Sequence, residues 1–329
     1  MWRCSLLAIL AAVVAMGCSD ATRSPAASPA SPAPQPAPRE LLTSLAQWDS
    51  ATAEARRAAA DFVAGREPGF ALLRMETFSC GGQTHEVAIY THARTGMEFV
   101  LVPGGSFVMG APPGTADVVG ADDSHTRQHT VTLTRPFLIS RTECTEAAWD
   151  RVGGSDHRKW HDPTLPIENV TWRECVAWCS KAGLEPPTEA QWEYACRAGS
   201  RTKWITGDDE SDLASVAWYA DDFEYPMQPV ATKHPNAFGL YDVHGNVWEF
   251  CRDTKGPYPA EAERDPAYDA PDDPTYGSQP RAARGGIAYG AGPSGSAIVA
   301  APSAWRAETG PDDHGDQQGF RPAKTVSLE

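Results

Sequence analysis

Apolar side chains recur at helical spacing between residues 41 and 62, near the start of the chain. One helical face collects them: Leu41, Leu45, Trp48, Ala55, Ala59 and Phe62. The repeat lasts about three heptads, which is short for a coiled coil. The pattern therefore predicts one amphipathic helix that packs on the domain following it.

From residue 96 onward, short apolar runs alternate with turn residues, as is typical of short strands. Extended segments are predicted at Phe99–Val102 and Ser106–Met109, and Val131, Leu133 and Phe137–Ile139 supply one more. Pro103–Gly105 supplies the turn between the first two segments.

Three short helices are predicted after these strands. Thr145 can cap the first of them. Thr171–Glu174 and Thr188–Gln191 are capping boxes, in which the first and fourth residues satisfy each other's backbone N–H groups. Gly183 and Gly199 are suited to end the second and third helices, because glycine adopts the left-handed conformation without strain.

Composition limits the class of protein. Hydrophobic residues make up 41% and charged residues 22% of the 329 residues, which disfavours a wholly disordered chain and a polytopic membrane protein. The formal net charge of −15 removes the electrostatic basis for binding duplex nucleic acid. The 28 glycines and 28 prolines indicate a loop-rich fold with modest regular structure.

The N-terminal segment carries signals for export. Residues 1–17 combine Arg3, an apolar run and small residues, as in a secretory signal peptide. Cys18 follows in a context that resembles a bacterial lipoprotein processing site, which predicts a lipid-anchored protein of the cell envelope, periplasmic or on the cell surface. A plain signal peptide cleaved nearby is the alternative. Residues 18–40 then comprise the anchor and a Pro/Ala-rich tether of extended, polyproline type.

Six cysteines lie beyond the anchor: Cys80, Cys144, Cys175, Cys179, Cys196 and Cys251. An even number in an exported chain favours disulfides, whose connectivity the sequence does not rank. Zinc is the competing interpretation, but Cys175 and Cys179 lack the usual short Cys-x-x-Cys spacing and no matching second pair follows.

A series of short motifs runs through residues 96–324: Phe107–Gly110, Glu143–Thr145, Pro166–Trp172, Pro187–Ala195, Pro235–Asp242, Gly245–Glu249, Arg284–Gly286 and Gly319–Arg321. Their order and spacing resemble the formylglycine-generating enzyme (sulfatase-modifying factor) family. The resemblance implies a single compact, loop-rich α+β domain over residues 96–329, related to C-type lectin folds and containing calcium. Residues 41–95 are then an N-terminal helix and a lead-in segment.

Active members of that family hold copper(I) with two cysteines that follow the Arg-Gly-Gly motif, and they oxidise a substrate cysteine to formylglycine. Counting from Arg284, the matching positions here are Gly290 and Gly295, and the serine after the two glycines is replaced by Ile287. No cysteine follows Cys251. Because copper(I) prefers thiolate ligands, the resemblance implies a scaffold without copper oxidase chemistry, and no catalytic residue is assigned.

The family's second calcium site is better matched. Asp242, Gly245, Val247 and Glu249 occupy its ligand positions, and hard oxygen ligands at close spacing suit calcium. The ion would have a structural role. The alternative is that this segment makes only buried turn hydrogen bonds. Residues 219–229 match the family's first calcium site loosely, so that site looks degraded.

Histidine pairs offer a rival chemistry. The pairs are His125 with His129 and His157 with His161, and the nearby carboxylates are Asp122, Asp123 and Asp162. Two imidazoles and one carboxylate are typical ligands of non-heme iron. Surface histidines without a metal are the alternative interpretation.

Four further residues match family positions around the groove or the core. Arg284 and Arg321 are expected to be structural, whereas Trp305 and Arg306 are candidates for ligand contact.

The favoured hypothesis is an exported, lipid-anchored domain that keeps the family scaffold as a calcium-stabilised binding or assembly module for a protein, peptide or glycan. Calcium is the expected cofactor, copper and nucleic acid are not expected, and the membrane is reached only through the N-terminal lipid. The alternative is an oxidoreductase of the same family, which forms formylglycine or uses non-heme iron held by histidines.

Overall fold

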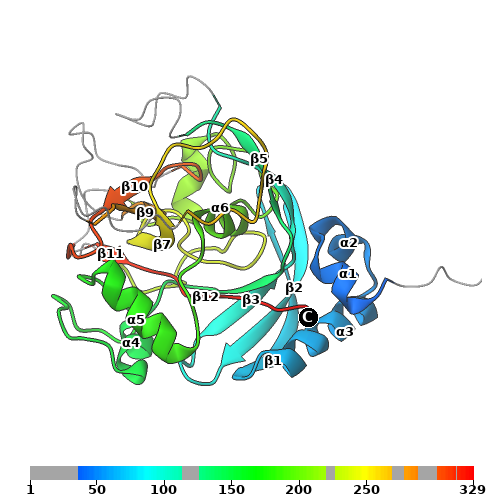
Figure 1. The fold of residues 1–329 in the computed structure, drawn as a ribbon, viewed down its shortest axis with the longest axis horizontal. Coiled ribbons are helices and arrows are strands. Elements are labelled where there is room, and N and C mark those ends of the chain that lie inside the picture. Colours follow the sequence, from blue (N-terminus) through cyan, green and yellow to red (C-terminus); the bar gives the residue numbers. More distant parts are fainter. Residues whose placement is uncertain (1–35, 113–125, 220–226, 269–277, 288–301, 316) are drawn as a thin grey trace, which may run out of the picture. The chain divides into compact units, whose positions relative to one another are not determined.

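A five-stranded antiparallel sheet with the strand order β1-β2-β3-β6-β12 organises the fold (Figure 1). The structure, a computed structural model, describes residues 36–112, 126–219, 227–268, 278–287, 302–315 and 317–329. The predicted signal peptide, Cys18 and most of the predicted tether lie outside them. The sheet strands are β1 (Phe70–Cys80), β2 (Gln83–His92), β3 (Glu98–Val102), β6 (Phe137–Ser140) and β12 (Ala323–Thr325).

Both faces of this sheet are covered, which explains why its central strands are apolar at successive positions. One face contributes to a core shared with the third central helix: Val87, Ile89, Val100, Val102 and Ile139. The alternate positions belong to a second core: Ala88, Tyr90, Phe99, Leu101 and Leu138. The predicted strands at residues 99–102 and 137–139 are therefore confirmed, with both faces buried.

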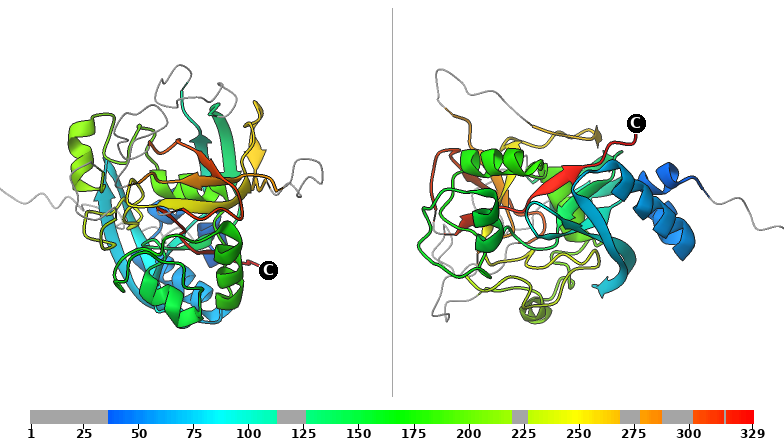
Figure 2. Two further views of the ribbon diagram at one scale, coloured as in Figure 1. Left: turned by 90° about the vertical axis from the view of Figure 1, so that its left-hand side faces the viewer. Right: turned by 90° about the horizontal axis from the view of Figure 1, so that it is seen from below.

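Three helices, not one, precede the sheet, so the prediction of a single helix is wrong. They are α1 (Pro38–Leu42), α2 (Leu45–Ser50) and α3 (Ala53–Arg66). The Ser44 and Thr52 side chains each cap a new helix and break the continuous one. The three helices pack on one side of the sheet, as Figure 2 also shows, and Trp48 Nε1 donates to the carbonyl of Glu86 in β2 at 2.6 Å. Packing on the following domain is thus confirmed.

The three predicted central helices are present as α4 (Glu146–Val152), α5 (Trp172–Ala182) and α6 (Glu189–Arg197). Both predicted capping boxes form, at Thr171 and at Thr188. Gly183 ends α5 in the left-handed conformation, whereas α6 ends at Ala198, one residue before the predicted glycine. Within the described residues, no helix has the length and apolar character needed to cross a bilayer.

Two smaller sheets and a 3-10 helix complete the described part. One sheet, ordered β4-β5-β8, consists of β4 (Gly105–Met109), β5 (His129–Leu133) and β8 (Glu263–Arg264). The other, ordered β10-β9-β7-β11, consists of β7 (Trp248–Thr254), β9 (Arg281–Arg284), β10 (Ala307–Thr309) and β11 (Gln318–Gly319). The 3-10 helix is η1 (Glu210–Ser215).

The β1–β2 hairpin joins the N-terminal segment to the rest of the fold. Since β2 pairs with β3, the boundary expected at residue 96 falls inside the sheet. Residues 35–329 form one compact unit of mixed helices and sheets, and the α+β prediction is confirmed.

Candidate functional site

The segment that would carry copper ligands, residues 288–301 with Gly290 and Gly295, lies outside the described residues. The residues that lead into this segment, 284–287, are described. β9 ends at Arg284, and Gly285 and Gly286 follow with φ values of 92° and 95°, which favour glycine. Ile287 is the last residue described before the gap.

The six cysteines after Cys18 are free thiols in the structure, so the predicted disulfides are not found. Burial raises the pKa of all six thiols. Cys144, Cys175 and Cys179 belong to one core, and Cys196 and Cys251 to the other. A buried neutral thiol packs as a small apolar side chain, and that is the role of these five.

Arg284 anchors the residues before position 288 on α6. Its Nε donates to Glu189 at 2.8 Å and its Nη2 to Glu193 at 2.7 Å, and all three side chains are fully buried. Burial alone would raise the pKa of Glu189, but Arg306 and Arg284 lower it to about 2. The arginine is therefore structural, as its family position implied.

Arg306 belongs to the same charge network. Its Nε and Nη2 donate to the two carboxylate oxygens of Glu189 at 2.5 and 2.6 Å, and its guanidinium stacks 4.0 Å from the ring centroid of Tyr258. The residue is only 4% exposed. Its Nη1 donates to the carbonyl of Gly256 at 2.7 Å, so Glu189 and Gly256 occupy the guanidinium, and the ligand contact expected of Arg306 stays a prediction.

Trp305, the residue before it, lines a cavity of about 270 Å³. The apolar part of the wall is Ala111, Pro112, Pro302, Ala304 and Trp305, and the polar part is Arg197, Arg201, Thr202, Lys203 and Asp208. Arg197 is paired with Glu193 at 2.8 Å, and the Asp208 carboxylate accepts from the backbone N–H of Lys203 at 2.7 Å. An indole wall beside Arg201 and Lys203 can accommodate a ligand that is partly apolar and negatively charged.

A larger cavity of about 330 Å³ shares Arg197 and Arg201 with the first, and Asp49, His85 and Tyr194 also contribute to its wall. His85 Nδ1 lies 3.0 Å from the Asp49 carboxylate. None of the residues expected to contact a ligand or metal lines this cavity.

Three carboxylates are buried together around the turn that precedes β7. The Asp242 Oδ2 atom accepts from the backbone N–H of Ala231 at 2.8 Å, while its buried Oδ1 has no hydrogen-bond partner among the described residues. Glu143 accepts from the side chain of Asn246 at 2.7 Å and from the backbone N–H of Val247 at 3.1 Å. Burial raises the pKa of Asp242 to about 6, and burial with the charges of Asp242 and Glu249 raises the pKa of Glu143 well above its ordinary value.

The third carboxylate, Glu249, is already satisfied. Its Oε1 accepts from Arg321 Nη2 at 2.7 Å, and its Oε2 accepts from Arg321 Nε at 2.9 Å and from the Trp192 indole at 2.7 Å. Arg321 is therefore structural, as expected. Asp242 Oδ1 is thus the oxygen of this group with free capacity for a hard cation, whereas both oxygens of Glu249 are occupied, which makes Glu249 the weakest match to a ligand role.

The predicted histidine pairs do not form in the described residues. His125 and the carboxylates Asp122 and Asp123 lie outside those residues. His129 is buried, and its Nε2 lies 3.1 Å from Glu263. His157 lies beside Glu174 and His314 rather than His161. Sequence spacing gave no signal for that cluster, because its members come from distant segments.

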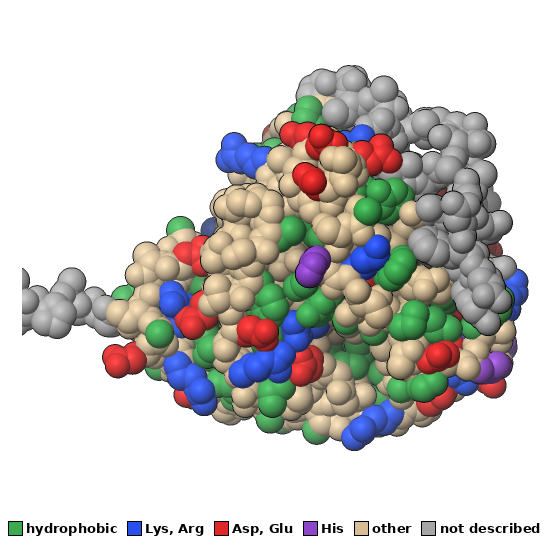
Figure 3. Space-filling view, turned by 180° about the vertical axis from the view of Figure 1, so that it is seen from behind, with side chains coloured by type: hydrophobic (Ala, Val, Ile, Leu, Met, Phe, Trp, Pro, Cys, Tyr) green, Lys and Arg blue, Asp and Glu red, His purple; other side chains and the backbone are tan. Residues whose placement is uncertain are grey.

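The distribution of surface charge can be followed on one face of the molecule. On the face in Figure 3, cationic and acidic side chains are interspersed and form no continuous basic area.

The chain is similar to known proteins in both sequence and fold. The family model described as the sulfatase-modifying factor enzyme 1-like domain matches residues 86–326. The formylglycine-generating enzyme of Bos taurus is 32% identical over 123 residues, which cover 32% of this chain and 32% of that protein. The chain thus matches about a third of that relative's length.

One further sequence relative and one solved structure are similar to this chain. A mouse (Mus musculus) protein named inactive C-alpha-formylglycine-generating enzyme 2 is 30% identical over 122 residues, covering 34% of this chain and 40% of that protein. The structure of PvdO from Pseudomonas aeruginosa matches 72% of this chain and 98% of that chain, with a TM-score of 0.58 and 27% identity.

Proposed function

Because the chain belongs to the family of the sulfatase-modifying factor enzyme 1-like domain, we propose that it uses this scaffold as a binding or assembly module and not as a copper-dependent oxidase. One observation carries the proposal. The chain has no cysteine after Cys251, and glycines, Gly290 and Gly295, stand at the two positions that match the copper-binding cysteines of the family's active members. Glycine has no side chain with which to ligate a metal.

The scaffold around those positions supports a retained non-catalytic role. Arg284 is held by Glu189 and Glu193 in a network without exposed surface. Such a network is costly to break, and it keeps the approach to residues 288–301 in place. The relatives include both a protein named as a formylglycine-generating enzyme and one named as inactive, so this family accommodates either outcome.

Calcium is proposed as a structural ion at the buried carboxylates. Asp242 would supply Oδ1, the buried oxygen without a partner among the described residues, and Gly245 and Val247 would supply backbone carbonyls as their family positions imply. The ion would neutralise the excess negative charge of Glu143 and Asp242. Glu249, already bound to Arg321 and Trp192, would orient the turn and contribute at most its remaining lone pairs.

Export and lipid anchoring at Cys18 are proposed from the sequence of residues 1–18. The test is incorporation of labelled fatty acid into the full chain in a bacterial host. Label in the wild type and its loss in Cys18→Ser support the anchor, and label retained in Cys18→Ser contradicts it.

The proposed ligand is an extended, acidic peptide segment that packs on Trp305 and faces Arg201 and Lys203. A library of immobilised synthetic peptides, graded in acidic and aromatic content, tests this with the full chain. Retention of acidic peptides by the wild type, reduced about tenfold or more in Trp305→Ala, supports the proposal. Equal binding by Trp305→Ala, or selection of basic peptides, contradicts it.

A glycan array probed with the same two proteins decides the remaining ligand class. Glycan binding that depends on Trp305, with no peptide retained, would replace the acidic peptide by a sugar.

A further inference from the structure

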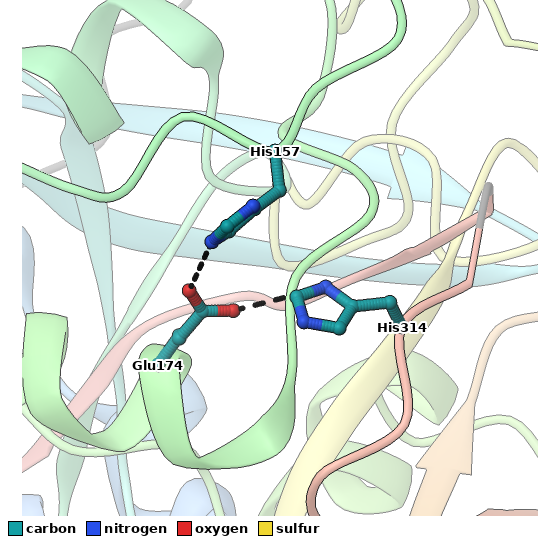
Figure 4. Close-up of side chains that lie close together, drawn as sticks. All are labelled: His157, Glu174 and His314. Atoms are coloured by element: carbon teal, nitrogen blue, oxygen red, sulfur yellow. Dashed lines mark ion pairs between the residues drawn. The ribbon is translucent and has the colours of Figure 1, made fainter.

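Three side chains from separate segments converge at one half-exposed place on the surface (Figure 4). His157 follows α4, Glu174 stands in the first turn of α5, and His314 precedes β11. One potential ligand atom from each lies within 4.8 Å of those from the other two. Among the described residues, this is the one group of three or more such side chains with that spacing.

Glu174 is held in place by its capping role. Its Oε2 accepts from the backbone N–H of Thr171 at 2.9 Å and from the Thr171 hydroxyl at 3.1 Å, and its Oε1 accepts from the hydroxyl of Ser155 at 2.5 Å. A carboxylate offers about four lone pairs, so about one remains, on Oε1. Nε2 of His157 lies 3.4 Å from that oxygen.

His314 is oriented by a backbone carbonyl. Its Nδ1 lies 2.8 Å from the carbonyl oxygen of Asn169 and 4.0 Å from Oε2 of Glu174. Donation to the carbonyl places the proton on Nδ1 and leaves the lone pair on Nε2. A histidine that binds a metal usually donates its other N–H to such an acceptor.

Asn169 links the two histidine segments. Its side-chain amide donates to the carbonyl of His157, its backbone N–H donates to the carbonyl of Gly315 at 3.0 Å, and its own carbonyl holds His314. The residue adopts a φ of 56°, which an asparagine tolerates better than most residues. Asn169 therefore holds the backbone of His157 and the imidazole of His314.

We propose that His157, Glu174 and His314 bind one divalent transition-metal ion such as Zn²⁺. The ion would connect the segment after α4, the N-terminus of α5 and the segment before β11. Two imidazoles and one carboxylate suit Zn²⁺, whereas Ca²⁺ would take oxygen ligands. Zinc bonds of about 2.0–2.1 Å place tetrahedral ligands roughly 3.3 Å apart. The distance of 3.4 Å between His157 and Glu174 is already close to that value.

The site keeps at least one coordination position open to solvent. The side chains of His157 and His314 are 51% and 40% exposed. With three protein ligands, water or a donor group from a partner would complete the shell. The zinc site is separate from the buried carboxylates around Asp242 and does not depend on the proposed peptide ligand.

Titration of the metal-free full chain tests the proposal. The protein carries no histidine tag, is stripped with EDTA, and is titrated calorimetrically with ZnCl₂ in the presence of excess CaCl₂. We expect one high-affinity zinc per chain, and a loss of about tenfold or more in affinity in His157→Ala and in His314→Ala. Glu174→Gln is the third variant, because glutamine preserves the capping box while weakening the metal ligand.

His161→Ala is the matched control, since His161 is exposed in the same loop and outside the cluster. Zinc should also raise the melting temperature of the wild type and of His161→Ala, but not of His314→Ala. Zinc affinity unchanged in both His157→Ala and His314→Ala, or absence of stoichiometric binding by the wild type, would overturn the site. A folded Glu174→Gln with wild-type zinc affinity would remove that residue from it.

Discussion

Trp305 and Arg306 are adjacent in the chain but face different environments. Trp305 lines a cavity that also includes Arg201 and Lys203, whereas Arg306 is buried in a two-point ion pair with Glu189. Strand β10 begins at the next residue, and successive side chains in extended backbone point to opposite sides. Substitution of Trp305 is therefore expected to affect the proposed ligand binding, and substitution of Arg306 to affect the stability of the fold.

Replacing Arg306 by alanine should destabilise the fold. The change leaves Glu189 with one of its two arginine partners, and breaking a buried pair costs about 3–5 kcal/mol. Arg57→Ala is the control, because Arg57 forms an exposed pair with Asp61 that is worth about 1 kcal/mol or less. Urea unfolding measures both. A loss in Arg306→Ala no larger than in Arg57→Ala would contradict the assigned role.

Asp242→Asn should respond to calcium differently from the wild type. In EDTA near pH 8, the variant should be more stable, because it removes a buried charge whose pKa is raised to about 6 by burial. Added calcium should stabilise the wild type by about 3 kcal/mol at a hundredfold excess over the dissociation constant, and the variant by little. Thermal unfolding measures the difference. An equal calcium response in both proteins would place the ion elsewhere or exclude it.

Asp253 should make stability depend on pH. Its carboxylate accepts from the backbone N–H groups of Glu189 and Tyr268, and burial with the charge of Glu189 raises its pKa from 3.8 to about 7. The folded state thus keeps a proton that the unfolded chain releases. The contribution of this proton is full below about pH 4 and is lost as the pH rises through about 7.

The difference in unfolding free energy between the wild type and Asp253→Asn isolates this group from other titrations. Raising the pH from about 4 to about 8 should lower it by up to about 4 kcal/mol. Asp61→Asn, an exposed position on α3, should give a nearly constant difference. A constant difference for Asp253→Asn as well would mean that its pKa is not raised.

Reducing agents should leave the melting temperature unchanged. All six cysteines after Cys18 are free thiols, whereas each disulfide would typically stabilise the fold by about 2–4 kcal/mol. Peptide mapping without reduction checks the same point. Linked peptides, together with a lower melting temperature in reductant, would restore the original disulfide interpretation.

Local signals predicted the three central helices and the central strands, but not the division of the N-terminal helix into three. The capping boxes at Thr171 and Thr188 form because both partners of each bond lie within four residues. The β1–β2 hairpin was not among the predicted elements, although Gly81 and Gly82 separate two strands and both adopt positive φ, a strong hairpin signal.

The chemistry of the candidate sites was less predictable, because it depends on contacts between distant segments. Glu189 and Arg306 are 117 positions apart, and spacing alone does not pair them. His157 was predicted to pair with His161 at i, i+4 spacing, but the loop that holds both is not helical. The chain instead brings His314 beside it through Asn169.

The most direct test of the central claim is a thiol oxidation assay on the full chain. The protein is loaded with copper(I) and incubated in air with a reductant and a synthetic sulfatase peptide that contains the target cysteine, with the bovine formylglycine-generating enzyme as positive control. Mass spectrometry of the peptide is expected to show unconverted cysteine with this protein and formylglycine with the control. Formylglycine produced by this protein at a rate comparable to that of the control would contradict the account.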